Sequence, residues 1–313
     1  MTVLLLLALL AMAATSARPA AALAGAPPAP AAAKKTYNLR ARPSIGQRIA
    51  YEQSLDTTLR IAANGAGNQR AETVERFHDQ TVVTCEQIIE IGKPPAMSKM
   101  VTFGPQCWSA TKINDREARK VGSIYAGKTV LFRIFEDGTL EQDFGVKPTR
   151  AQMQRMKNMF VASADLYPER PVAVGERCRA DRAIAALFDL GKDDTSSTIF
   201  TLKEVRSENG RDVAVVAVSA AVIKQHERGF NVEMSLEGQW QIDVESGVEL
   251  KIDLTGKSTI AVIPPKGKKH ASAVPAGVQV TGDGTLEMHR VARLLGPEDA
   301  NNTASAADGA AAR

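Results

Sequence analysis

The residues that could carry acid–base or metal chemistry are few and scattered along the chain. The four histidines are His78, His226, His270 and His289, and none has a second histidine four residues away, as a zinc-binding helix requires. The spacings G-x-S-x-G, H-E-x-x-H, C-x-x-C and the P-loop are absent. The sequence therefore predicts no catalytic residue, no metal ligand and no cofactor, and it leaves open only a hydrolase whose site has no recognised motif.

Three cysteines, Cys85, Cys107 and Cys178, offer the remaining reactive groups. Cys107 precedes a tryptophan, as in some cysteine proteases, but it lacks their preceding Cys-Gly-Ser/Ala context and lies in a β-rich segment. A hairpin centred on Ala96 would place Cys85 opposite Cys107, within the Cα separation of a disulfide. We therefore predict a Cys85–Cys107 disulfide with Cys178 free. Two buried thiols remain an equal alternative.

A methionine-rich segment is a candidate ligand-binding element. Residues 149–163 begin with a capping box at Thr149, and Met153, Met156 and Phe160 then form one apolar stripe of a helix. Methionines can bind Cu(I), but no cysteine or histidine joins the stripe, so an apolar face packed on a sheet is favoured. We expect the stripe to cover the concave face of a sheet near Trp240, where it could help to bind an apolar ligand.

The clearest structural pattern is a long hairpin over residues 230–262. Apolar and polar residues alternate along both halves, which is typical of half-buried strands, and Glu245-Ser246-Gly247 separates them as a turn. A hairpin centred on Ser246 pairs Trp240 with Ile252 and places the apolar residues on one face.

Gly238 and Gly256 interrupt this hairpin at neighbouring positions on the two strands, and glycine within a strand marks a bend or close approach. Strands of about 15 residues would extend on the order of 50 Å if straight, at ~3.3 Å per residue, so we expect strong curvature. The predicted fold is mainly β, with long, curved antiparallel sheets and one covering helix. It could be half-barrel-like and internally duplicated, since Asp137-Gly138-Thr139-Leu140-Glu141 recurs as Asp283-Gly284-Thr285-Leu286-Glu287.

The N-terminal segment indicates export. An apolar run over residues 2–14 is too short to span a bilayer but suits the core of a secretory signal, with cleavage after Ala24 or, alternatively, Ala17. No later apolar run is long enough to cross a membrane, so no transmembrane segment is expected in the mature chain. The predicted divisions are a signal peptide (1–24), an Ala/Pro-rich linker (25–40), a first β half ending in a helix (41–165), a second β half (166–296) and a disordered tail (297–313).

One short segment of the sequence resembles a motif of known proteins. The segment Pro168-Glu169-Arg170-Pro171-Val172-Ala173-Val174-Gly175-Glu176 resembles the P-x-x-P-V-x-V-G-D-x-W stretch of uncharacterised exported bacterial β-rich proteins. In this chain Cys178 stands where those proteins usually have tryptophan. The resemblance implies an exported β-rich fold, and it implies no activity.

The amino-acid composition restricts the classes of partner that the protein is expected to bind. Hydrophobic residues make up 44% of the chain, aromatic residues only 5%, and the formal net charge is +4. This balance gives neither the basic surface nor the stacking residues of a nucleic-acid-binding protein. We expect a periplasmic or extracellular protein, foremost a non-catalytic envelope protein that binds a macromolecule or has a structural role. The alternatives are a carrier of an apolar, lipid-like ligand, which a cavity of roughly 300 Å³ or more would favour, and a hydrolase.

Overall fold

The structure is a computed structural model. It describes residues 34–42, 44–64, 70–88, 97–135, 139–145, 148–149, 167–168, 170–188, 190, 194–226, 230–262 and 279–296. Most of these residues belong to one large antiparallel sheet, as the alternating sequence predicts. A separate pair, β1 (Thr36–Tyr37) and β9 (Val172–Ala173), forms a second, two-stranded sheet.

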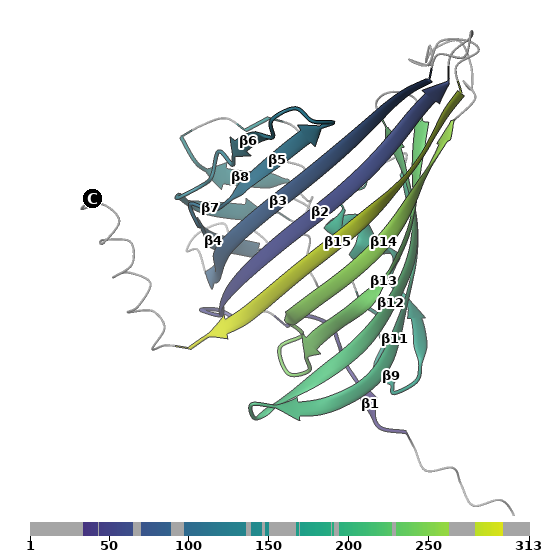
Figure 1. Ribbon diagram of the computed structural model, residues 1–313. Coiled ribbons are helices and arrows are strands. Elements are labelled where there is room, and N and C mark those ends of the chain that lie inside the picture. Colours follow the sequence, from purple (N-terminus) through teal and green to yellow (C-terminus); the bar gives the residue numbers. More distant parts are fainter. Residues whose placement is uncertain are drawn as a thin grey trace, which may run out of the picture. The chain divides into compact units, whose positions relative to one another are not determined.

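Thirteen strands make up the large sheet, and it is open rather than closed on itself (Figure 1). The main path runs β10-β11-β12-β13-β14-β15-β2-β3-β4-β7-β8, while β5 pairs with β3 and with β6. The strands are β2 (Arg48–Asn64), β3 (Arg70–Ile88), β4 (Met97–Phe103), β5 (Trp108–Ile113), β6 (Arg119–Gly122), β7 (Thr129–Ile134), β8 (Leu140–Asp143), β10 (Arg177–Arg179), β11 (Thr195–Glu208), β12 (Arg211–His226), β13 (Phe230–Asp243), β14 (Glu249–Val262) and β15 (Gln279–Leu295).

The two halves predicted from the sequence share this one sheet. The last strand, β15, pairs antiparallel with β2 over the whole length of both strands, from Gln279 opposite Asn64 to Leu295 opposite Arg48. Figure 1 shows the two strands side by side at the middle of the sheet. The centre of the fold is therefore formed by segments more than 200 residues apart in the sequence.

The register of the 230–262 hairpin is confirmed. Trp240 pairs with Ile252 and Gly238 with Leu254, as a turn centred on Ser246 requires. The preceding hairpin, β11–β12, turns through Asn209 and Gly210, which both have positive φ, of 51° and 76°. Two such residues between antiparallel strands form the tight turn whose twist matches that of the flanking strands.

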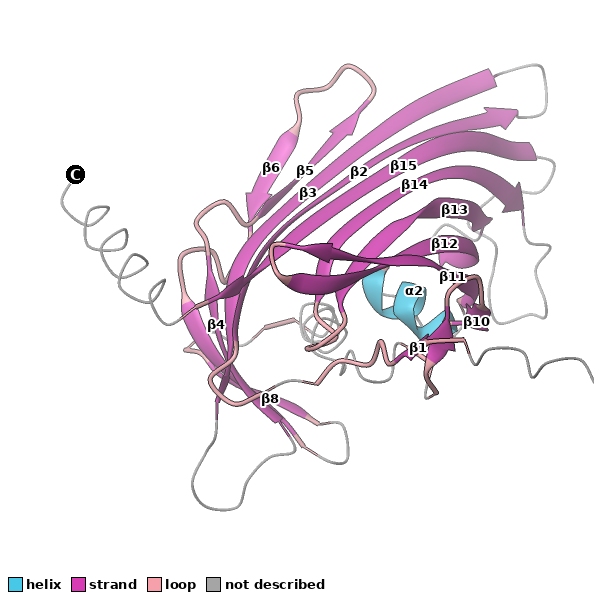
Figure 2. Ribbon diagram, turned by 90° about the horizontal axis from the view of Figure 1, so that it is seen from below, coloured by secondary structure: helices cyan, strands magenta, loops and turns pink. Residues whose placement is uncertain are grey.

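The expected curvature is also present, and Figure 2 shows the strands bending around the concave side. Glycines allow close approach where the strands bend. A Cβ atom on Gly238 would collide with the backbone of Asp253 and Leu254, and one on Gly256 would collide with the side chain of Leu236. The absence of a side chain at these two positions lets neighbouring strands come together on the concave face.

One helix, α2 (Asp181–Leu187), lies in the described part of the chain, on the concave side near β11 (Figure 2). Ala183 and Ile184 bury its inner face in the main apolar cluster. At its start, the Asp181 carboxylate accepts a 2.7 Å hydrogen bond from the backbone N–H of Thr198 in β11. This contact joins the helix to the sheet. The helix predicted at 149–163, with Met153, Met156 and Phe160, lies outside the described residues.

Two expectations need correction. The linker predicted over residues 25–40 extends too far, because Thr36–Tyr37 forms β1 and Leu39 is buried in the core. The suggested duplication does not match the strand positions either. Asp283–Glu287 lies in the middle of β15, whereas Leu140 and Glu141 belong to the short edge strand β8.

Helices that are both apolar enough and long enough to span a bilayer are not found among the described residues.

Candidate functional site

The concave face of the sheet contains a cavity of about 550 Å³. Tyr51, Gln53, Leu55 and Thr57, which are alternate residues of β2, line it, so one face of that strand forms part of its wall. Neighbouring strands contribute the residues opposite them in register. Most of the lining is apolar or aromatic, including Leu55, Phe77, Phe103, Val121, Leu187, Phe188, Met234 and Leu286, and the charged members are Asp79, Lys224 and Arg290.

Two apolar clusters border the cavity. The larger one is built on β11–β15 and α2, around Trp240, Phe200 and Ile184. The smaller one is built on β3, β4, β7 and the loops beside them, around Phe103, Tyr125 and Phe132. Members of both clusters appear in the cavity wall. The cavity is therefore the space that remains between the two cores on one continuous face.

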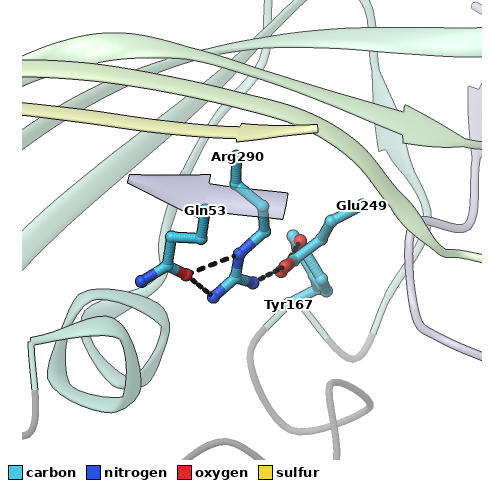
Figure 3. Close-up of polar contacts among 4 residues, drawn as sticks. All are labelled: Gln53, Tyr167, Glu249 and Arg290. Carbon is cyan, nitrogen blue, oxygen red and sulfur yellow. Dashed lines mark hydrogen bonds and ion pairs between the residues drawn. The ribbon is translucent and has the colours of Figure 1, made fainter. Parts of the chain in front are cut away.

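Four polar side chains form a connected group (Figure 3), and two of them, Gln53 and Arg290, line the cavity. Arg290 in β15 lies opposite Gln53 in β2, and its Nε and Nη2 atoms donate to Gln53 Oε1 at 2.9 and 2.6 Å. Arg290 Nη1 donates to Glu249 Oε2 at 3.0 Å, and the hydroxyl of Tyr167 donates to Glu249 Oε1 at 2.6 Å. Glu249 thus connects Tyr167 to Arg290 at the centre of the sheet.

The electrostatics of this group follow from its partial burial. The side chains of Arg290 and Glu249 are 22% and 12% exposed, so each needs the other to balance its charge. Burial, followed by the charge and the hydrogen bond of Glu249, raises the pKa of Tyr167 well above its usual value of 10.0, although Arg290 partly opposes this shift. The tyrosine therefore stays protonated and acts as a hydrogen-bond donor at neutral pH.

The predicted disulfide rested on a wrong register. Cys85 pairs with Val101 in β4, because β3 and β4 pair six residues out of step with the hairpin centred on Ala96. Cys85 and Cys107 are thiols, and Cys107 Sγ donates to the carbonyl oxygen of Val82 at 3.2 Å. Burial raises the pKa of the Cys85 thiol, with Lys99 and Tyr51 opposing the shift, so this thiol is a weak nucleophile. Cys178 is also a thiol.

Of the predicted ligand-binding residues, only Trp240 can be placed. It is 1% exposed and packs edge-to-face on Phe200, with ring centroids 5.0 Å apart, so it belongs to the core rather than to the described lining of the cavity. Met153, Met156 and Phe160 fall outside the described residues.

The polar group itself was missed, although the sequence contains a signal for part of it. Gln53 interrupts the apolar parity of Tyr51 and Leu55 in β2, and Arg290 interrupts that of Leu286 and Met288 in β15. A single polar residue on the buried face of a strand is a feature that needs a partner. Only the pairing of β15 with β2 shows that the two interruptions meet.

Comparisons with known proteins give distant likenesses. No family model and no curated protein matches this chain. Among solved structures, lipovitellin, described for its lipid–protein interactions, is 9% identical with a TM-score of 0.41; the match covers 81% of this chain and 25% of lipovitellin, so this chain spans about a quarter of that protein.

Two further structures align over most of both chains. DynF from the dynemicin biosynthesis pathway of Micromonospora chersina is 11% identical with a TM-score of 0.20, covering 88% of this chain and 89% of its own. An outer membrane channel from Pseudomonas putida F1 is 8% identical with a TM-score of 0.20, covering 82% and 98%. Likenesses this distant do not identify a function.

Proposed function

We propose that this protein is an exported, non-catalytic binding protein that carries an apolar, lipid-like ligand in the cavity on the concave face of its sheet. The observation that carries this proposal is the cavity itself. Its volume of about 550 Å³ exceeds the roughly 300 Å³ at which ligand cavities begin, and just over half of its lining residues are apolar or aromatic.

A binding role is favoured over a hydrolytic one by the chemistry of the wall. Among the described lining residues there is no histidine, and the Cys107 thiol donates to the backbone carbonyl oxygen of Val82 at 3.2 Å. The hydroxyl of Thr81 lies 3.5 Å from the Asp79 carboxylate, at the outer limit of a hydrogen bond. A hydrolytic nucleophile needs an adjacent base or another activating group. Export remains part of the proposal and is supported by the apolar run at residues 2–14, the small residues that follow it, and the resemblance of residues 168–176 to exported β-rich proteins.

The test combines ligand retention with a variant that narrows the cavity. The full-length protein is expressed, purified gently from its own cell fraction, and examined by native mass spectrometry for a retained apolar molecule. The delipidated protein is then titrated with the uncharged probe N-phenyl-1-naphthylamine, whose fluorescence rises on entering an apolar site. We expect saturable binding by the wild-type protein.

Leu55→Trp places a large side chain in the cavity wall and should weaken probe binding at least tenfold. Val291→Trp is the matched control, because Val291 lies on β15 beside β2 but is 56% exposed and does not line the cavity. It should bind the probe as the wild type does. Absence of both retained ligand and saturable binding, or equal binding by Leu55→Trp and wild type, would exclude the cavity as the binding site.

A further inference from the structure

The Arg290–Gln53 part of the cavity wall has hydrogen-bond donors without a described acceptor. Arg290 has five N–H donors, of which three are directed to Gln53 and Glu249, so one N–H on each Nη atom has no acceptor among the described residues. The Nε2 amide of Gln53 likewise makes no hydrogen bond to that part of the chain, since Gln53 is an acceptor in both of its bonds. Both side chains line the cavity. A ligand there meets donors, and it needs an oxygen atom to satisfy them.

The charge at this end is already balanced. The carboxylate of Glu249 lies 3.0 Å from Arg290, and both side chains are largely buried. An anionic group placed on Arg290 would make the site net negative in a partly desolvated position, which is unfavourable. The other charged residue near this end of the described lining is Asp79, an acid that is 4% exposed, and it does not favour an anion either.

The second cation of the wall, Lys224, already has a partner, because its Nζ donates to the backbone carbonyl oxygen of Phe188 at 3.3 Å. Through the paired strands, Lys224 aligns with Val232, Ile260 and Gly282, and Gly282 is 290 − 282 = 8 residues from Arg290 along β15. Between these two positions the lining includes the apolar side chains of Leu55, Leu286 and Met234, with Thr57 opposite Leu286 and Asp79 opposite Leu55.

From this arrangement we propose that the ligand is an uncharged amphiphile, bound with an alcohol or ester oxygen at Arg290 and Gln53 and with its hydrocarbon part along Leu55, Leu286 and Met234. The inference rests on the proposed function and adds a selectivity to it: the Arg290–Glu249 pair admits a neutral oxygen acceptor and rejects an anionic headgroup. Glu249 is a positioning and charge-balancing residue here.

The experiment compares three ligands with C16 chains, two with a neutral headgroup and one with an anionic headgroup. Hexadecanol, methyl palmitate and palmitate at pH 8 each displace N-phenyl-1-naphthylamine from the full-length protein. We expect the alcohol and the ester to bind at least tenfold more tightly than the carboxylate. Wild-type protein that binds palmitate as tightly as, or more tightly than, the neutral ligands overturns the inference while leaving the proposed function intact. Failure of all three to bind would count against the proposed function itself.

Glu249→Gln keeps the shape of the side chain and removes its charge. Because Arg290 is then unbalanced, this variant should bind palmitate at least tenfold more tightly than wild type does, reducing or reversing the preference. Asp253→Asn is the matched control, since it removes one carboxylate from the opposite face of β14, where Asp253 pairs with Lys251 and His289. It should keep the wild-type preference, and an equal shift in both variants would contradict the assignment to Glu249. The wild-type comparison stands alone if Glu249→Gln does not fold.

Discussion

At the scale of single residues, Tyr167 links the polar group to the stability of the fold at high pH. Its pKa is raised by burial and by Glu249, so the folded state retains the phenolic proton at a pH where an unfolded chain, with a pKa of about 10, releases it. This contribution to stability is complete below the unfolded pKa and is lost as the pH rises above about 10 towards the folded pKa.

Tyr167→Phe should therefore have two separable effects. At pH 7 it should lower the free energy of unfolding by about 1–2 kcal/mol, because Glu249 loses a donor in a buried position. Between about pH 10 and 11.5 its stability should fall less steeply than that of the wild type, because the titrating group is gone. Urea unfolding at a series of pH values measures both effects. An unchanged alkaline slope would contradict the raised pKa.

At the scale of elements, the two glycines of the β13–β14 hairpin differ in what surrounds them. An added Cβ at Gly238 meets backbone atoms of Asp253 and Leu254, which cannot move without distorting β14. At Gly256 the nearest atom is Cδ2 of Leu236, the end of a flexible side chain. The physical difference is that the severe contact at Gly238 is with backbone, whereas at Gly256 it is with a side-chain end and the nearest backbone atom, the carbonyl oxygen of Ser235, is 3.0 Å away.

Gly238→Ala is accordingly expected to destabilise the protein by about 1–3 kcal/mol, and Gly256→Ala by clearly less. Chemical denaturation measures the free energy of unfolding of both variants and of the wild type. Each variant is the control for the other, because both add one methyl group to the same hairpin. Equal losses of stability, or a larger loss for Gly256→Ala, would show that backbone contact does not govern this bend.

The same element scale shows why one register could be predicted from the sequence and another could not. In the 230–262 hairpin the short turn at residues 245–247 leaves little freedom, so the apolar alternation fixes the pairing. In the β3–β4 pair, a hairpin centred on Ala96 would place Cys85 opposite Cys107, whereas the observed partner is Val101. The two registers differ by six residues, which is an even number. Both keep the same side chains on the same face, so alternation cannot distinguish them, and the predicted disulfide failed for this reason.

At the scale of the whole molecule, the cavity could not be predicted because it depends on long-range pairing. The fold class, the curvature and the concave apolar face can be predicted from the local alternation of apolar and polar residues and from the positions of glycines within strands. The meeting of Gln53 with Arg290 depends on β15 closing onto β2. A pattern within one strand contains no information on that partner, so the polar end of the site became visible only in the structure.

The open sheet gives a last prediction about the molecule as a unit. Because the cavity wall takes residues from both apolar clusters, a ligand that fills it contacts two parts of the core that are separate clusters among the described residues. A ligand that binds only the folded state adds RT ln(1 + [L]/Kd) to its stability, or about 2.7 kcal/mol at a hundred times Kd. For a protein of this size each kcal/mol raises the melting temperature by about 2–4 °C, so saturation with hexadecanol should raise it by roughly 5–10 °C.

Differential scanning fluorimetry of the delipidated full-length protein across a range of ligand concentrations measures this shift. Leu55→Trp should show a much smaller shift at the same concentrations, and Val291→Trp should follow the wild type. The dependence on concentration is the decisive feature, since a specific site requires the melting temperature to keep rising with the logarithm of free ligand above Kd, whereas detergent-like action on the unfolded chain would lower it. A melting temperature that falls or stays constant in the wild type would mean that the cavity does not stabilise the fold by binding, and that the two clusters are coupled through the strands alone.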